Sequence, residues 1–185
     1  MNKINQLIKQ VKEADAIVVG GGSGMSNAAG MDFWYSASPL FLKHMKYYYD
    51  KYHFQGIFKR YYTQFDSQEE HWAYIVKMLN LIFTEPAQKP TYDYLKTVIG
   101  NKPTHYVTTN QDGLFKKYFG EDAVSEIQGS WFFFQSSNTK TDKHLYSAEP
   151  IVKELLPKIK DHKLDREDFP KSTVYDSPLI AWVRG

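Results

Sequence analysis

The stretch Ala16-Ile-Val-Val-Gly-Gly-Gly-Ser-Gly-Met-Ser-Asn-Ala-Ala-Gly30 decides how this chain folds. Its first residues, 16–19, form a short apolar run rich in β-branched side chains, which is typical of a buried strand. Glycines follow at positions 20, 21, 22 and 24, and glycine lets a backbone turn tightly and approach a ligand closely. Residues 26–29 can then open a helix. A strand, a glycine turn and a helix N-terminus form an anion site, because free N–H groups and the helix dipole both favour a phosphate.

We interpret this stretch as the pyrophosphate loop of a dinucleotide site. The alternative is a glycine-rich turn that only links a strand to a helix, since such a turn is a weak signal by itself. Trp34 and Tyr35 come directly after the loop, where they can wall a nucleoside pocket or pack in the core. The glycines alone do not decide between these readings.

Two further strands carry polar loops of the same kind. Residues 104–108 and 123–127 read as strands, and the loops 109–113 and 128–130 follow them. Alternating strands and helices predict a parallel sheet, in which ligands bind beyond the carboxyl ends of the strands. We therefore expect these two loops to converge on the glycine loop. The alternative is that Asn110 and Asp112 are only turn and capping residues.

Helices are predicted around this sheet from periodicity and caps. Residues 2–14 place apolar side chains at helical spacing and predict an amphipathic helix laid against the sheet. The remaining helices are expected at 39–50, 54–65, from Ser67 onward with a capping box, at 91–99, at 113–119 and at 149–160. A strand at 131–134 and a polar loop at 136–148 complete the prediction.

The residues predict the fold class α/β, with a parallel sheet and a small inserted module that begins with the strand at 131–134. Cysteine is absent, which excludes disulfides and thiolate zinc sites, and the histidines lack metal-ligand spacing.

The composition bounds the function classes. The 185 residues suit one domain with a small insert, and a net charge of +2 gives no support for nucleic-acid binding. No stretch approaches the roughly 18 apolar residues of a membrane span, and the N-terminus has no signal-peptide core. We expect a soluble, cytoplasmic protein with neither a nucleic-acid nor a membrane partner.

The three loops, taken in order, resemble the sirtuins. The family pattern Gly-Ala-Gly-Ile-Ser-x-x-x-Gly-Ile-Pro-Asp-Phe-Arg is similar to Gly22-Ser-Gly-Met-Ser26 with Gly30-Met-Asp-Phe33, although the Pro and Arg are missing. The pattern Thr-Gln-Asn-Ile-Asp-Gly-Leu is similar to Thr108-Thr-Asn-Gln-Asp-Gly-Leu114. The pattern His-Gly-Ser/Thr is similar to Gln128-Gly-Ser130. The second pattern is the most specific of the three.

The resemblance implies NAD as cofactor and a set of site residues. Asn110 corresponds to the residue at the nicotinamide ribose, Asp112 to the residue in the nicotinamide pocket, and Gln128 to the family's catalytic histidine. These three are the candidate catalytic residues, and no metal ligand is implied. The implied cofactor-binding residues are Gly20, Gly21, Gly22, Ser23, Gly24, Ser26, Gly30, Asp32, Phe33, Thr109, Asn110, Asp112 and Gln128.

Gln128 indicates which reaction to expect. The family histidine is the base of deacylation, and an amide has no useful basicity near neutral pH. The macrodomain-linked class M sirtuins look closer, because they carry a glycine-richer loop and Gln at this position. The resemblance to that branch implies a protein ADP-ribosyltransferase. Its acceptor would be a protein, and lipoyl-carrier proteins are among the acceptors of that branch.

Two departures from the family pattern leave alternatives open. Residues from Phe169 to Arg184 look like half of a zinc module whose thiols are replaced, and a sirtuin normally continues beyond the position of Gly185. The resemblance therefore implies a C-terminally truncated copy whose activity is uncertain. Its fold class would be α/β, with an incomplete Rossmann-like parallel sheet, a helical insertion and a small zinc-less module. The core would cover residues 1–130 with the insertion at about 37–100, and the remnant of the small module would cover 131–185. The alternative functions are an NAD-dependent protein lysine deacylase and a non-catalytic fragment or NAD-binding module.

Overall fold

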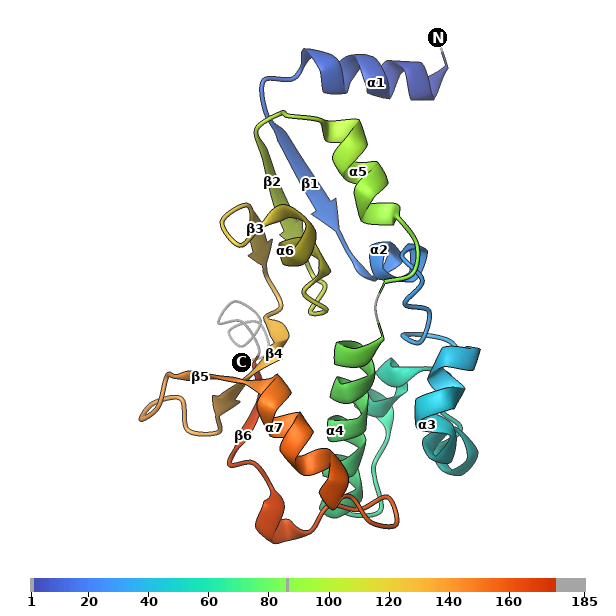
Figure 1. Ribbon diagram of the computed structural model, residues 1–185, viewed down its shortest axis with the longest axis vertical. Helices are drawn as coiled ribbons and strands as arrows, with labels where there is room; N and C mark the ends of the chain where they lie inside the picture. The colour runs from blue at the N-terminus through green and yellow to red at the C-terminus, as the bar shows by residue number, and fades with distance from the viewer. Residues whose placement is uncertain (1, 86, 176–185) are drawn as a thin grey trace.

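The computed structural model describes residues 2–85 and 87–175, which form two lobes drawn one above the other in Figure 1. The upper lobe holds a three-stranded sheet in the order β1-β2-β3, and the lower lobe holds a three-stranded sheet in the order β5-β4-β6. The strands are β1 (Ile17–Gly21), β2 (Thr104–Thr108), β3 (Val124–Glu126), β4 (Ser130–Ser136), β5 (Leu145–Ser147) and β6 (Ser172–Tyr175).

The upper sheet is parallel throughout. Ile17 lies opposite Thr104 on β2, and Tyr106 of β2 lies opposite Val124 on β3. All the strands therefore end at one edge, which faces the lower lobe in Figure 1. This arrangement confirms the predicted α/β class with a parallel sheet. The lower sheet is antiparallel, with β5 and β6 on either side of β4.

Strand β1 is longer than the sequence predicts. Gly20 and Gly21 complete the strand, and the turn begins at Gly22, which is the N-cap of α2 (Ser23–Ala28). Helix α2 therefore begins before the predicted start at Ser26. Gly21 has a packing role in the strand, because the ring of Phe115 on α6 (Leu114–Phe119) lies so close that an added Cβ would lie 2.2 Å from Cζ.

Alanine at position 21 is expected to destabilise the chain by about 1–3 kcal/mol, because the Phe115 ring must leave its place in the core. Gly20→Ala is the matched control, since no atom lies within 4 Å of a Cβ added there. The free energy of unfolding in urea measures both variants. Equal stability of Gly21→Ala and Gly20→Ala would contradict the packing role of Gly21.

The remaining helices of the upper lobe are α1 (Lys3–Glu13) and α5 (Thr91–Ile99). Helix α1 forms as predicted, but the expectation that it packs on the sheet is wrong: none of its residues is buried, and Ile4 is 63% exposed. The Lys102 ammonium donates to the carbonyl oxygens of Lys12 and Ala14 at 2.6 Å each. These bonds hold the end of α1 at the edge of the lobe farthest from the lower lobe (Figure 1).

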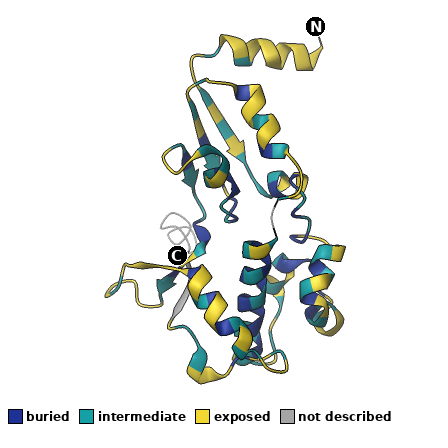
Figure 2. Ribbon diagram, in the orientation of Figure 1, coloured by how far each residue is buried: buried dark blue, intermediate teal, exposed yellow. Residues whose placement is uncertain are grey.

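Helix α4 (Gln68–Thr84) lies at the centre of the lower lobe. Helices α3 (Pro39–Tyr52) and α7 (Ala148–Leu155) pack against it. Ser38 and Ser67 are confirmed as N-caps, because the Ser38 hydroxyl accepts from the Phe41 N–H and the Ser67 hydroxyl accepts from the Glu70 N–H. The capping box at Ser67 is only half formed, since the Glu70 carboxylate bonds Lys51 and Tyr52. Helix α4 is the element with the most buried residues in the described part of the chain (Figure 2). Fully buried aromatic rings fill the layer between the helices, among them Phe41, Tyr48, Phe54 and Tyr74.

The predicted α-helix over 54–65 is wrong. The chain instead forms a 3₁₀ helix, η1 (Ile57–Tyr62), after Gly56, whose φ of 125° suits glycine alone. The N–H of Ile57 donates to the carbonyl of Phe33, and the N–H of Phe58 donates to the carbonyl of Trp34. These long-range bonds replace helical ones, so the local periodicity misled the prediction.

The C-terminal part also differs from the prediction. Strand β5 lies within the expected loop 136–148, and the helix expected over 149–160 ends at Leu155, followed by the 3₁₀ helix η2 (Leu156–Lys158). A second 3₁₀ turn, η3 (Arg166–Asp168), precedes β6. The later part of the supposed zinc-module remnant, from Asp176 to Arg184, lies outside the described residues. Within the described ranges, no helix is long and apolar enough to cross a membrane.

Candidate functional site

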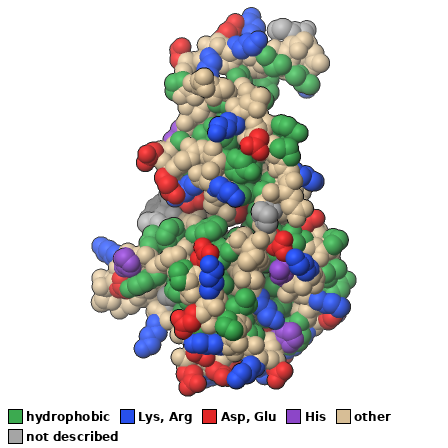
Figure 3. All heavy atoms as spheres, viewed as in Figure 1, with side chains coloured by type: hydrophobic (Ala, Val, Ile, Leu, Met, Phe, Trp, Pro, Cys, Tyr) green, Lys and Arg blue, Asp and Glu red, His purple; other side chains and the backbone are tan. Residues whose placement is uncertain are grey.

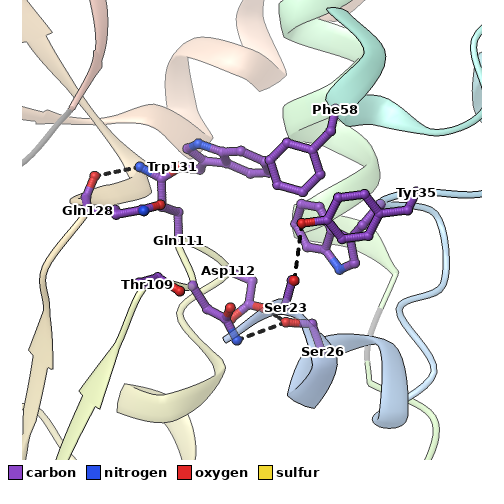
Figure 4. Close-up of a pocket in the computed structure, with 11 residues that line it drawn as sticks. Ser23, Ser26, Tyr35, Phe58, Thr109, Gln111, Asp112, Gln128 and Trp131 are labelled. Carbon is purple, nitrogen blue, oxygen red and sulfur yellow. Dashed lines mark hydrogen bonds between the residues drawn. The ribbon is translucent and has the colours of Figure 1, made fainter. Parts of the chain in front are cut away.

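A pocket of about 190 Å³ lies where the carboxyl ends of β1, β2 and β3 face the lower lobe. All three predicted loops reach it. The residues that line it are Ser23, Ser26, Trp34, Tyr35, Phe58, Thr109, Asn110, Gln111, Asp112, Gln128 and Trp131. Figure 4 shows Ser26, Thr109 and Asp112 on one side, and the rings of Tyr35, Phe58 and Trp131 on the other.

Asn110 ties the second loop to the first. Its side-chain amide donates to the carbonyl of Gly22 and to the hydroxyl of Ser26, both at 3.0 Å. Its backbone N–H donates to the Thr108 hydroxyl at 2.9 Å, and that hydroxyl donates to the Gly21 carbonyl at 3.0 Å. Asn110 is 7% exposed, so its amide is oriented in a nearly dry setting. The turn-only interpretation of Asn110 does not account for these bonds across the sheet.

Asp112 is a buried carboxylate with fixed oxygens. One oxygen accepts a short hydrogen bond from the Ser26 hydroxyl, and the other accepts from the Leu114 N–H at 3.0 Å. Burial raises the pKa of Asp112, while the bonds from Ser26 and Leu114 oppose that shift. The bond to Leu114 at the start of α6 is the predicted capping role. The bond to Ser26 adds a second role, because it fixes the orientation of the carboxyl group at the pocket.

An aromatic wall closes the opposite side of the pocket. We use this name for Trp34, Tyr35, Phe58 and Trp131, whose rings contact one another at centroid distances of 4.9–6.1 Å. The Tyr35 hydroxyl donates to the Ser23 hydroxyl at 3.1 Å, which joins the wall to the glycine loop. Such a surface suits a planar ring, because aromatic rings stack or meet edge to face. The nucleoside-pocket reading of Trp34 and Tyr35 thus has support in the geometry.

Gln128 reaches the pocket from the third loop. The amide of Gln111 donates to the Gln128 carbonyl at 2.6 Å, and the Trp131 N–H donates to the Gln111 carbonyl at 3.1 Å. These bonds join the second loop to the third. None of the described residues that line the pocket is a histidine, so the ionisable side chains at hand are Asp112 and Tyr35.

The structure brings together only part of the predicted site. Ser23, Ser26, Thr109, Asn110, Asp112 and Gln128 line the pocket, whereas the predicted residues that do not line it are Gly20, Gly21, Gly22, Gly24, Gly30, Asp32 and Phe33. Gly22 still contributes its carbonyl to Asn110, and Phe33 is fully buried in the core. One oxygen of Asp32 is buried without a hydrogen-bond partner. The roles assigned to these residues stay predictions.

Sequence reasoning missed Gln111, Phe58 and Trp131 as lining residues. Gln111 had a usable signal, because it lies between Asn110 and Asp112 in the second loop. Phe58 and Trp131 had none, since their approach to Trp34 depends on how the lobes pack. In the described part of the chain, no group of three or more His, Asp or Glu side chains is placed to hold a metal ion.

No family model matches the chain, but curated proteins do. The chain is 25% identical over 170 residues to "Protein ADP-ribosyltransferase" of Staphylococcus aureus (strain Mu50 / ATCC 700699), covering 91% of this chain and 53% of that protein. It is 27% identical over 160 residues to "Probable bifunctional ADP-ribose hydrolase/ADP-ribosyltransferase" of Fusarium oxysporum f. sp. cubense, covering 80% of this chain and 25% of that protein. The chain thus spans about half the length of the first relative and a quarter of the second.

Solved structures show a likeness in fold. A mutant Sir2 homologue, in a complex with 2'-O-acetyl ADP ribose, aligns over 100% of this chain and 70% of its own, with a TM-score of 0.53 and 18% identity. The sirtuin-like fold expected from the three loops is therefore confirmed.

Proposed function

We propose that this sirtuin-like chain transfers ADP-ribose from NAD to a protein acceptor and releases nicotinamide. The observation that carries the proposal is the buried network of Asn110, Ser26 and Asp112 at the carboxyl edge of the sheet, opposite the aromatic wall. Both curated relatives have ADP-ribosyltransferase in their descriptions, and the Sir2 homologue is a complex with an ADP-ribose derivative. These names support the reaction class without giving the acceptor.

The residues present fit the dinucleotide. The first residues of α2, Ser23 and Gly24, follow the N-cap Gly22, and their backbone N–H groups would hold the pyrophosphate. Asn110 would hold the adjoining ribose, and Asp112 with the aromatic wall would hold the planar nicotinamide ring. NAD supplies an activated bond between ribose and a cationic pyridinium leaving group.

In the transfer step, the bond from the ribose to nicotinamide breaks, a bond from the ribose to an acceptor atom forms, and the acceptor atom gives up its proton to solvent. The leaving ring keeps the electron pair of the broken bond, and positive charge develops on the ribose. The ionised carboxylate of Asp112, held by Ser26 and Leu114, would stabilise that charge, because preorganised charges act strongly in a dry site. Gln128 lies at the same pocket and supplies no base.

The test is a calorimetric titration of the 185-residue chain with NAD, followed by an assay of nicotinamide release. We expect saturable binding, release of nicotinamide and transfer of adenine-labelled ADP-ribose to protein. Absence of saturable binding contradicts the proposal. Binding without release favours the NAD-binding module instead, and thermal unfolding shows whether the sample is folded.

Gln128→His separates the transferase from the deacylase. With an acetyl-lysine peptide, we expect the native chain to form no O-acetyl-ADP-ribose and Gln128→His to form some, because the imidazole restores a base at the ribose. Formation of this product by the native chain would favour the deacylase. A protein acceptor, and a lipoyl-carrier protein in particular, stays a prediction.

A further inference from the structure

A second and larger pocket lies beside Asp112, with a volume of about 560 Å³. Among the described residues, Asp112 alone lines both pockets. The larger one is lined by the C-terminal end of α4, by helix α6 and by residues of β3 and β4. Figure 1 shows that these elements lie where the lobes meet. The volume of the larger pocket is in the range of sites that enclose small organic molecules. The residues assigned to NAD binding, apart from Asp112, take no part in it.

Aromatic rings form the apolar side of this pocket. Phe83 of α4 and Phe132 of β4 pack with their ring centroids 4.9 Å apart. Gly113 allows this position, because an added Cβ there would lie 2.9 Å from the Phe132 ring. Met31 and Leu114 add buried apolar surface behind the rings. This side therefore suits an apolar body of about the size of an aromatic ring.

The charged side of the pocket carries more acid than base. The Lys116 ammonium lies 3.0 Å from the Glu121 carboxylate and 3.1 Å from the Glu126 carboxylate, so one cation serves two anions. The Glu121 side chain is 78% exposed, whereas that of Glu126 is 7% exposed. Water therefore solvates Glu121 far more than Glu126. The ion pair with Lys116 uses one oxygen of Glu126, and the pocket beside this carboxylate leaves room for a further partner.

The other charges at the pocket do not restore the balance. Glu85 is already engaged outside the pocket by Lys43 and His44, each at 2.7 Å. Lys117 is exposed at the rim, where water screens it. Burial raises the pKa of Glu126, in keeping with a carboxylate that its single cation does not fully compensate. A buried anion in this state gains from a further cationic partner.

We propose that this pocket binds a small organic amine, with an apolar aromatic-sized body against Phe83 and Phe132 and a protonated amino group on Glu126. With the ligand bound, two cations, the Lys116 ammonium and the ligand ammonium, would face the two carboxylates of Glu121 and Glu126. An anionic ligand of the same shape would meet the Glu126 and Glu85 carboxylates instead. This site does not depend on the proposed transferase activity, because it shares with the NAD site only Asp112.

Two probes of matched shape test the proposal: phenylbutylamine and phenylbutyrate, titrated calorimetrically into the whole chain at neutral pH. We expect saturable binding of the amine and an affinity for the acid that is lower by about tenfold or more. Glu126→Gln, which keeps the side-chain shape, is expected to weaken amine binding by about tenfold and to remove the preference. Glu121→Gln is the matched control, and its effect is expected to stay within about threefold, because exposed pairs contribute little.

Two further variants test the apolar side of this pocket. Phe132→Leu should weaken both probes through loss of ring contact, and circular dichroism checks that it folds. Asn101→Ala, at the opposite end of the upper sheet, should leave the binding of both probes unchanged. The proposal is overturned if neither probe binds saturably, if the acid binds as well as the amine, or if Glu126→Gln binds the amine like the native chain.

Discussion

Asn110→Ala is expected to lower the rate of nicotinamide release from NAD by about a hundredfold or more, the usual effect of removing one preorganised donor from an active site. The Asn110 amide is the only side chain seen to bond both the Gly22 carbonyl and the Ser26 hydroxyl among the described residues. Ser26 in turn donates to Asp112. Loss of the amide therefore removes a contact proposed for the ribose and frees the hydroxyl that orients the carboxylate.

The measurement is the initial rate of nicotinamide release at saturating NAD, with the NAD dissociation constant determined in parallel. Asn101→Ala is the matched control, because Asn101 is exposed before the start of β2, at the opposite end of the sheet. Thermal unfolding of both variants shows whether the fold persists. A rate for Asn110→Ala equal to that of Asn101→Ala would remove Asn110 from the proposed site.

Lys51→Met is expected to lower the free energy of unfolding by about 3 kcal/mol, because it leaves a buried carboxylate without its cation. The Glu70 side chain is fully buried, and the Lys51 ammonium donates to its two oxygens at 3.0 and 2.9 Å. The Tyr52 hydroxyl donates to the same carboxylate at 2.9 Å. In the Lys51→Met variant, this hydroxyl is the side-chain partner that Glu70 retains. A lone tyrosine cannot compensate a buried negative charge.

The effect should be present at neutral pH. Hydrogen bonds from Lys51 to Asp66 and then to Glu70 raise the pKa of Lys51, so the lysine is charged in both the folded and the unfolded chain below its ordinary pKa. Its contribution to stability is therefore complete at neutral pH and is lost only as the pH rises through the alkaline range. A urea unfolding series at neutral pH measures it.

Lys46→Met provides a control on the same helix. Lys46 pairs with Asp50 at the surface, where the side chains are 69% and 53% exposed, and its loss should cost less than about 0.5 kcal/mol. The double variant Lys51→Met with Glu70→Met should recover part of the stability, because no unpaired charge remains buried. A loss for Lys51→Met no larger than that for Lys46→Met would contradict the role given to the pair.

The helix caps and the parallel strands were predictable because their signals are local. Ser38 and Ser67 cap their helices through residues three positions ahead, and such spacing is visible in any sequence. The polar residues after β2 and β3 could be assigned to one edge because parallel strands end together. The prediction of a helix over 54–65 failed for the opposite reason. The N–H groups of Ile57 and Phe58 donate to the carbonyls of residues 33 and 34, which are far away in the sequence.

The sequence by itself determined the parallel α/β sheet and the convergence of Ser26, Asn110, Asp112 and Gln128 on one pocket, since strand periodicity and loop position suffice for both. Only the tertiary structure decided which aromatic rings close that pocket, that α1 stays exposed, and that Glu126 is buried beside Phe132. The physical reason is that burial and charge compensation depend on contacts between segments far apart in the chain. Hydrophobic periodicity predicts which face of a helix or strand is apolar. The packing of the two lobes determines which residues that face contacts.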